Sequence, residues 1–313
     1  MAALSHSAAR RRRIPWHLVV FLGPAVLLYT AFLVFPLFDS LRLSLFGPGG
    51  GGLGVFVGLD NYVTLLTDSD WSPRFWGALQ NNVVFFAIHM LVQNPIGLLL
   101  AVLLSTRVLR GRAVYRTLIF APTVLSVVII GFIWKLILSP LWGVAEGGLK
   151  AVGLGDFFGP WLGLQGPALV TIGLMSVWQY VGIPMLLFSA ALLAIPDEII
   201  EAARVDGAGP LRIFGRIQLP MIAPTVGIVA ILTFVGNFNA FDLVYAVQGG
   251  LAGPEFSTDL LGTFFYRTFF GFQLQLGSPT MGATVAGMMF LIILLGVCLY
   301  LFGLQRRLTT YEA

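Results

Sequence analysis

MGATVAGMMFLIILLGVCLYLFGL, residues 281–304, is a stretch of 24 residues without a single charged side chain. A helix needs about 20 consecutive, mostly apolar residues to cross the hydrocarbon core of a bilayer. Lipid offers the backbone no hydrogen-bond partners, so the chain must satisfy its own peptide groups there, as a helix does. Residues 281–304 are therefore predicted to form a membrane-spanning helix.

The same pattern recurs along the chain, which has 313 residues, of which 58% are hydrophobic and 10% charged. A soluble domain carries about 25% charged residues, so lipid must replace water over most of this surface. Five further apolar stretches are long enough to span, at about 18–38, 83–104, 117–138, 166–190 and 223–247. The sequence predicts an all-α, polytopic membrane protein with six transmembrane helices in a single transmembrane domain, residues 1–313.

The basic residues predict the orientation of these helices. Most of the 18 Lys and Arg residues fall in four clusters, at 10–13, 107–116, 204–216 and 306–307. Short loops rich in Lys and Arg tend to stay in the cytoplasm, so both termini are expected there, together with the loop between the fourth and fifth spans. The net charge of +4 follows this distribution, and no nucleic-acid partner is expected.

No catalytic or metal site is apparent in the sequence. The three histidines are widely scattered, and Cys298 is the single cysteine, so no zinc-ligand spacing occurs. A phosphate-binding P-loop requires a Gly-Lys pair, but the two lysines, Lys135 and Lys150, do not follow glycine. We therefore expect neither an enzyme nor a cofactor or metal bound by this chain.

The loop between the fourth and fifth spans, IPDEIIEAARVDGAGPLRIFGRIQLP at residues 195–220, has the local chemistry of two short helices. Pro196 and the acids after it favour a helix start, because the N-terminus of a helix carries partial positive charge. Gly207 permits a turn, Pro210 suits the start of a second helix, and Pro220 is expected to end it. A cytoplasmic helix–turn–helix is predicted over about 195–220.

The surface expected for this hairpin leaves two interpretations open. Ala202 and Ala203 keep the first helix slim enough to enter a groove, whereas Ile213, Phe214 and Ile217 are expected to expose apolar area at the membrane surface. An amphipathic hairpin lying in the interface would satisfy the same pattern.

The spacing of Glu201-Ala202-Ala203, Gly207, Ile217 and Leu219-Pro220 resembles the EAA loop of permease subunits of ABC importers. The resemblance implies that this loop docks into a cleft on a cytoplasmic ATPase subunit. Glu201 would then contact a basic residue of the ATPase, Ala202 and Ala203 would pack in its cleft, and Gly207 would allow the bend. It also implies partners: a second homologous permease subunit, two ATPase subunits that bind ATP and Mg, and an extracytoplasmic sugar-binding protein.

Other segments, among them VGLDNYVTLLTD (57–68), YRTLIFAPTVLS (115–126) and FDLVYAVQGG (241–250), resemble the carbohydrate-uptake branch of that family. This implies a subunit that forms half of a translocation pathway for a sugar or oligosaccharide, in the cytoplasmic (inner) membrane of a bacterium or archaeon. A polyol or glycerol-phosphate importer is the alternative within the family. A self-sufficient secondary transporter is the alternative outside it, although such carriers usually show repeats and several intramembrane acids.

Polar residues inside spans are expensive in lipid and usually face a cavity or another helix. On a continuous helix at 223–247, Asn239 and Asp242 would share one face, while Asn237 would point nearly opposite and bond a neighbouring helix. These two residues, with Gln179 and Tyr180 of the fourth span, are the predicted substrate-pathway residues. Interhelical hydrogen bonding is the alternative role for such groups.

The resemblance adds one detail to this assignment. Maltose-type permeases carry Asn-Phe-Asn-Asn-Phe where this chain has Asn237-Phe238-Asn239-Ala240-Phe241. Asn239 thus matches a residue implied to contact sugar, whereas Ala240 departs from the pattern and argues against the same sugar.

Overall fold

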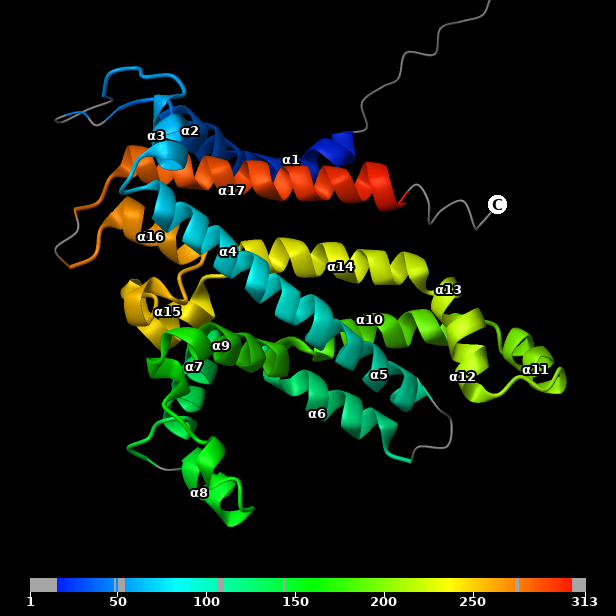
Figure 1. The fold of residues 1–313 in the computed structure, drawn as a ribbon. Coiled ribbons are helices and arrows are strands. Elements are labelled where there is room, and N and C mark those ends of the chain that lie inside the picture. Colours follow the sequence, from blue (N-terminus) through cyan, green and yellow to red (C-terminus); the bar gives the residue numbers. More distant parts are fainter. Residues whose placement is uncertain are drawn as a thin grey trace, which may run out of the picture.

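The computed structural model describes residues 16–47, 49, 54–105, 110–142, 144–273 and 276–305. Helices dominate these residues, and the extended pairing found among them is an isolated bridge between Phe46 and Phe56. Most long helices run side by side, with α11 and α12 at one end of the molecule and α3, α15 and α16 at the other (Figure 1).

The α-helices follow one another closely along the chain. In order they are α1 (Trp16–Tyr29), α2 (Phe35–Leu43), α3 (Asp60–Thr67), α4 (Ser72–Ile88), α5 (Asn94–Ser105), α6 (Arg112–Val124), α7 (Val127–Ile137), α8 (Val144–Ala151), α9 (Gln165–Tyr180), α10 (Gly182–Leu193), α11 (Asp197–Val205), α12 (Pro210–Ile213), α13 (Leu219–Met221), α14 (Ala223–Phe238), α15 (Asp242–Gln248), α16 (Leu261–Phe270) and α17 (Pro279–Leu299). Wider π-helical turns join α1 to α2 (Thr30–Val34), α4 to α5 (His89–Gln93) and α12 to α13 (Phe214–Gln218), and extend α17 (Tyr300–Gln305).

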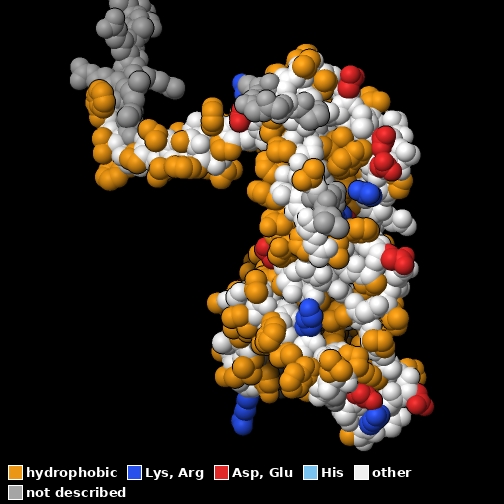
Figure 2. Space-filling model, turned by 90° about the vertical axis from the view of Figure 1, so that its left-hand side faces the viewer, with side chains coloured by type: hydrophobic (Ala, Val, Ile, Leu, Met, Phe, Trp, Pro, Cys, Tyr) orange, Lys and Arg blue, Asp and Glu red, His pale blue; other side chains and the backbone are white. Residues whose placement is uncertain are grey.

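Three continuous helices in the described part are long and apolar enough to cross a membrane: Val20–Leu43, Ser72–Ser105 and Pro279–Gly303. Counting each of four bent helix pairs as one span raises the number to seven. The multi-pass, all-helical architecture predicted from the sequence is thus confirmed. The α1 part of the first helix projects from the bundle while α2 packs against α17, and Figure 2 shows the projecting surface to be mostly hydrophobic, as contact with lipid requires.

Two of the predicted spans are not the continuous helices that the sequence suggested. The third, 117–138, is bent by 97° between α6 and α7. The fifth, 223–247, is interrupted because α14 ends at Phe238 and α15 begins at Asp242, with Phe241 in a non-helical conformation at φ −146° and ψ −55°. The prediction of one helix over 223–247 was therefore wrong.

Asn82 of α4 explains how the interruption after α14 is tolerated. Its side-chain nitrogen donates to the carbonyl of Asn237 at 2.8 Å, and its side-chain oxygen accepts from the amide of Leu261 at 2.7 Å. Asn82 is fully buried, and its two bonds give partners to a carbonyl at the end of α14 and to a first-turn amide of α16 that has no partner within its own helix. One side chain thereby ties the end of α14 to the start of α16.

The helix–turn–helix prediction for 195–220 is confirmed in its main features. The first helix begins at Asp197 after Pro196, Gly207 adopts φ +79°, and the second helix begins at Pro210. Pro220 does not end that helix, which continues to Met221 and bends by 67° before α14. Proline fits there because it occupies the first turn of α13, where its missing amide proton is not needed.

The apolar face of the second hairpin helix also differs from the prediction. Ile213 is buried, and Phe214 and Ile217 are half-buried, so this face packs within the chain. Burial of Ile213 inside the protein removes the apolar stripe that an interfacial hairpin would need.

Replacing Asn82 by Leu tests the tie between α14 and α16. The substitution keeps a similar volume but leaves the buried Leu261 amide without its partner, at a cost of about 1–3 kcal/mol. It also removes one of the two bonds to the Asn237 carbonyl, which still accepts from the Ala240 amide at 3.2 Å. We expect a lowered unfolding temperature in a thermal-shift measurement on the purified complex. Gln80→Leu, at an exposed position of the same helix, is the control; equal shifts for the two variants would contradict the role given to Asn82.

Candidate functional site

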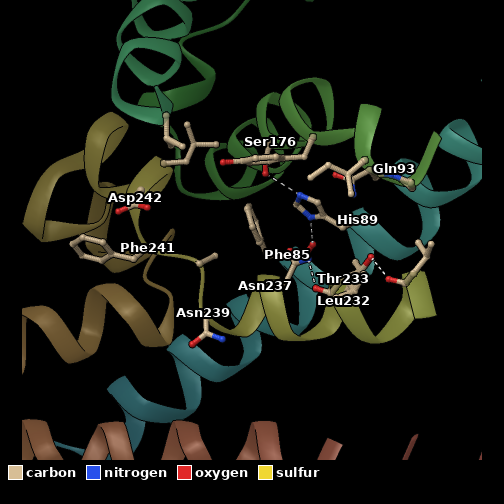
Figure 3. A pocket seen from close by; sticks show the side chains of 18 of the residues that line it. Phe85, His89, Gln93, Ser176, Leu232, Thr233, Asn237, Asn239, Phe241 and Asp242 are labelled. Carbon is tan, nitrogen blue, oxygen red and sulfur yellow. Dashed lines mark hydrogen bonds between the residues drawn. The ribbon is translucent and has the colours of Figure 1, made fainter. Parts of the chain in front are cut away.

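A cavity of about 460 Å³ lies between the α4–α5 junction, α9, α10, α14 and the interrupted segment that follows α14 (Figure 3). Its walls are mainly apolar, with a line of polar side chains along them. The polar residues that line it are His89, Gln93, Ser176, Tyr180, Thr233, Asn237, Asn239 and Asp242. A mainly apolar cavity with a few convergent polar groups is the usual form of a small-molecule site.

Three of the four predicted pathway residues line this cavity, although the reasoning that selected two of them was wrong. Asn239 and Asp242 do not share a helical face, since the helix is interrupted between them. Both nevertheless line the cavity, on the non-helical segment between α14 and α15 and at the start of α15 (Figure 3). Asn239 donates to the carbonyl of Val235 at 2.9 Å, which leaves its side-chain oxygen free to accept. Tyr180 of α9 also lies in the wall.

Gln179, the fourth, is absent from the cavity wall. It is fully buried, and its side-chain nitrogen donates to the carbonyl of Leu125 at 3.3 Å. Its own backbone carbonyl accepts from the hydroxyl of Thr123 at 3.0 Å. Both bonds join α9 to the bend between α6 and α7. The side chain of Gln179 therefore points to this bend and not into the cavity.

Asn237 was predicted to lie outside the pathway, but the structure places it in the cavity wall. Its side chain was expected to bond a neighbouring helix, but its side-chain nitrogen donates to Thr233 of its own helix at 2.7 Å. The contact with a neighbouring helix is made by its backbone carbonyl, through Asn82.

His89 and Ser176 form a buried polar pair in the cavity wall that the sequence analysis did not identify. One ring nitrogen of His89, Nδ1, lies 2.8 Å from the carbonyl oxygen of Phe85, and Nε2 lies 2.9 Å from the hydroxyl of Ser176. A carbonyl only accepts, so Nδ1 carries the proton, Nε2 accepts, and the serine donates. The available signal was an ionisable residue inside a predicted span, which is itself an indication of function.

The electrostatics of the cavity are simple. Among the described residues in its wall, Asp242 carries a formal charge, and the other polar groups are hydroxyls, amides and the neutral imidazole of His89. Hydroxyls and amides both donate and accept hydrogen bonds, as the hydroxyls of a sugar do. The carboxylate at one end accepts from hydroxyls and repels anions.

The predicted coupling residues lie at the other end of the molecule, around α11 and α12 (Figure 1). Glu201, Ala202, Gly207, Leu219 and Pro220 are exposed, and Ile217 is half-buried. Ala203 is buried within the chain itself at 9% exposure, so Glu201 and Ala202 offer more of the first helix to a partner than Ala203 does. Their contact with an ATPase stays a prediction.

Comparison with known proteins agrees with this geometry. Residues 93–309 match the family described as the binding-protein-dependent transport system inner membrane component. The chain belongs to this family. It is therefore a multi-pass permease subunit of a binding-protein-dependent ABC import system.

Relatives of known name match nearly the whole chain. It is 34% identical to the lactose transport system permease protein LacF of Rhizobium radiobacter, over 92% of this chain and 94% of the relative. It is 32% identical to the sn-glycerol-3-phosphate transport system permease protein UgpA of Escherichia coli, over 94% and 95%. A solved bacterial ABC transporter involved in the import of alginate has a chain that superimposes with a TM-score of 0.75 at 24% identity, over 93% of this chain and 96% of that one, and so shares the fold.

Asn239→Ala and Asp242→Asn test the polar end of the cavity. Each removes one hydrogen-bonding or charged group where the chain turns, so we expect slower substrate uptake by the reconstituted complex, with assembly unchanged on size exclusion. Asp39→Asn, at an exposed carboxylate of α2, is the control. Wild-type uptake kinetics in both cavity variants would show that these residues do not contact the substrate.

Proposed function

We propose that this chain forms half of the translocation pathway of an ATP-driven importer for an uncharged sugar or oligosaccharide. The observation that carries the proposal is the cavity beside the α14–α15 interruption, whose hydroxyl and amide groups match a polyhydroxylated substrate. Asn239 and Asp242 are the substrate-binding residues in this proposal, with Tyr180 beside them.

The charge of the cavity favours a neutral sugar over the alternative, glycerol phosphate. UgpA, by its name, serves sn-glycerol-3-phosphate, and LacF serves lactose. Phosphate recognition usually relies on Arg or Lys, and the described residues of this cavity wall include neither. Asp242 would repel a phosphate, so the chemistry supports the sugar reading.

Six membrane crossings are the topology that we propose. α1 with α2, α4 with α5, α6 with α7, α9 with α10, α14 with α15, and α17 would each make one crossing. Val181 alone separates α9 from α10, which supports counting them together. The positions of the Lys and Arg clusters support a cytoplasmic location for both termini and for the α11–α12 hairpin.

The proposal requires partners to supply what this chain lacks. A second homologous permease would complete the pathway, two cytoplasmic ATPase subunits would bind ATP and Mg, and an extracytoplasmic binding protein would deliver the sugar. The chain itself would catalyse no reaction. A self-sufficient secondary transporter is less well supported, since Asp242 is the one acid in the described cavity wall and a carrier needs groups that couple ions.

Reconstitution of the complex in liposomes tests the proposed function directly. Uptake of radiolabelled lactose and maltose is measured with the binding protein outside and ATP inside. We expect uptake with ATP and none without it. Sugar movement by this chain alone, without ATP, would show that it is a secondary transporter.

Two substitutions in the hairpin test coupling to the ATPase. Losing one partner of a buried, hydrogen-bonded charge pair costs about 2–5 kcal/mol, so Glu201→Ala should lower transport and sugar-stimulated ATP hydrolysis. Gly207→Val should do the same: its Cβ would have room, but the glycine sits at φ +79°, which a β-branched residue strongly disfavours. Sugar binding by the isolated binding protein should not change.

Glu198→Ala is the matched control for these variants, because it removes an acid from the first turn of the same helix. Stimulated ATP hydrolysis is measured for all three variants in the same liposomes. If Glu201→Ala and Gly207→Val hydrolysed ATP as Glu198→Ala does, the hairpin would be a connector without a coupling role.

A further inference from the structure

Four aromatic rings form a continuous row that starts at the interruption between α14 and α15. Phe241 stacks on Tyr245 with ring centroids 5.0 Å apart and an interplanar angle of 27°. Tyr266 lies 5.2 Å from Phe241 and 5.1 Å from Tyr245, and Phe270 lies 5.0 Å from Tyr266. The row therefore runs from the chain interruption onto α16.

The row begins at the wall that two hollows share. Phe241 and Asn239 line the central cavity and also a second hollow of about 580 Å³, which α16 and α17 complete. Tyr266 lines the second hollow as well. A molecule held against Tyr266 would thus lie next to the residues that we propose bind substrate.

The course of α16 gives the row a direction. This helix starts against the interruption, where a Cβ at Gly262 would lie 2.6 Å from the carbonyl oxygen of Ala240. Positions 262, 266 and 270 follow one another at one-turn spacing on the same face. Tyr266 and Phe270 therefore lie progressively farther from the cavity, toward the end of the bundle that carries α3 (Figure 1).

The rings are not core residues. Phe241, Tyr245 and Tyr266 are half-buried, and Phe270 is 64% exposed, whereas Leu261 and Phe264 of the same helix are buried. The face of α16 that carries Leu261 and Phe264 thus packs inward, while the rings of Tyr266 and Phe270 stay accessible. Aromatic residues are common at membrane interfaces, and unlike aliphatic side chains they also present flat faces to a ligand.

Accessible ring faces of this kind can stack against a pyranose ring. An aromatic face carries the negative part of the ring quadrupole and attracts weakly positive C–H groups. A pyranose presents several such groups on one flat face, while its hydroxyls point outward to polar partners. An acyclic polyol or glycerol phosphate has no comparable flat face.

We propose that Phe241, Tyr245, Tyr266 and Phe270 form an aromatic track that receives a pyranose unit and passes it to Asn239 and Asp242. This inference rests on the proposed importer function and deepens it, because it names the substrate class as a pyranoside. The track binds the apolar face of the sugar, and the cavity beyond it binds the hydroxyls.

The test uses the whole complex in liposomes, with its binding protein outside and ATP inside. Radiolabelled lactose, maltose, glucitol and glycerol 3-phosphate are compared in the wild type. Tyr266→Leu removes the ring face but keeps apolar volume, while Tyr266→Phe keeps the ring. We expect the maximal rate of pyranoside uptake to fall about tenfold in Tyr266→Leu and to change less than about twofold in Tyr266→Phe, the former corresponding to about 1.4 kcal/mol.

Phe234→Leu is the control, since it removes a ring from α14 that packs against Phe86 outside both hollows. Tyr266→Leu uptake equal to the wild type or to this control would overturn the track, and so would an equal loss in Tyr266→Phe. Failure of the Tyr266→Leu complex to assemble would assign the ring to a protein contact instead. Uptake of glucitol or glycerol 3-phosphate in preference to both sugars would overturn the pyranoside class but leave an ATP-driven importer, whereas ATP-independent uptake would overturn the proposed function itself.

Discussion

Every peptide group inside lipid must find its hydrogen-bond partner within the protein. The cavity lies beside the places where the helices are interrupted and their backbone groups need partners from elsewhere. Two interruptions flank it, one between α6 and α7 and one between α14 and α15. At each interruption a buried side-chain amide from another helix bonds the backbone. Gln179 donates to the Leu125 carbonyl, and Asn82 donates to the Asn237 carbonyl and accepts from the Leu261 amide. These amides supply hydrogen bonds to backbone groups at the interruptions that flank the cavity.

This constraint also explains how much of the fold the sequence predicts. Apolar stretches of spanning length predict a multi-pass helical protein, and the local chemistry of Pro196, Gly207 and Pro210 predicts a helical hairpin. Both signals act over a few residues, and both predictions are confirmed. The interruption after Phe238 depends on Asn82, which lies 155 residues from Asn237 along the chain. No local pattern in 223–247 reports on a partner so distant, so the sequence indicated a continuous helix there.

The candidate site shows the same division. Asn239, Asp242 and Tyr180 could be selected because polar groups in spans are costly, a rule that needs no knowledge of contacts. The rule does not say which groups face a cavity and which support the backbone. Gln179 was therefore placed on the pathway although it bonds the Leu125 carbonyl, and Asn237 was placed away from it although it lines the cavity. His89 and Ser176 required the packing of α4 against α9, since their bond joins residues 87 positions apart.

Two helices connect the cavity to the hairpin at the far end of the molecule. α10 carries Pro184 and Leu187 in the cavity wall and then leads into α11, while α14 leaves the hairpin at Ile222 and carries Val229 and Thr233 back to the same wall. Phe188 and Leu192 of α10 pack in one buried cluster with Ile222 and Val229. Because close-packed helices transmit displacement rather than absorb it, movement of the hairpin would be expected to shift both walls together. The Asn82 tie holds the far end of α14 to α4 and α16, so such movement would tilt α14 about the interruption where Asn239 and Asp242 lie.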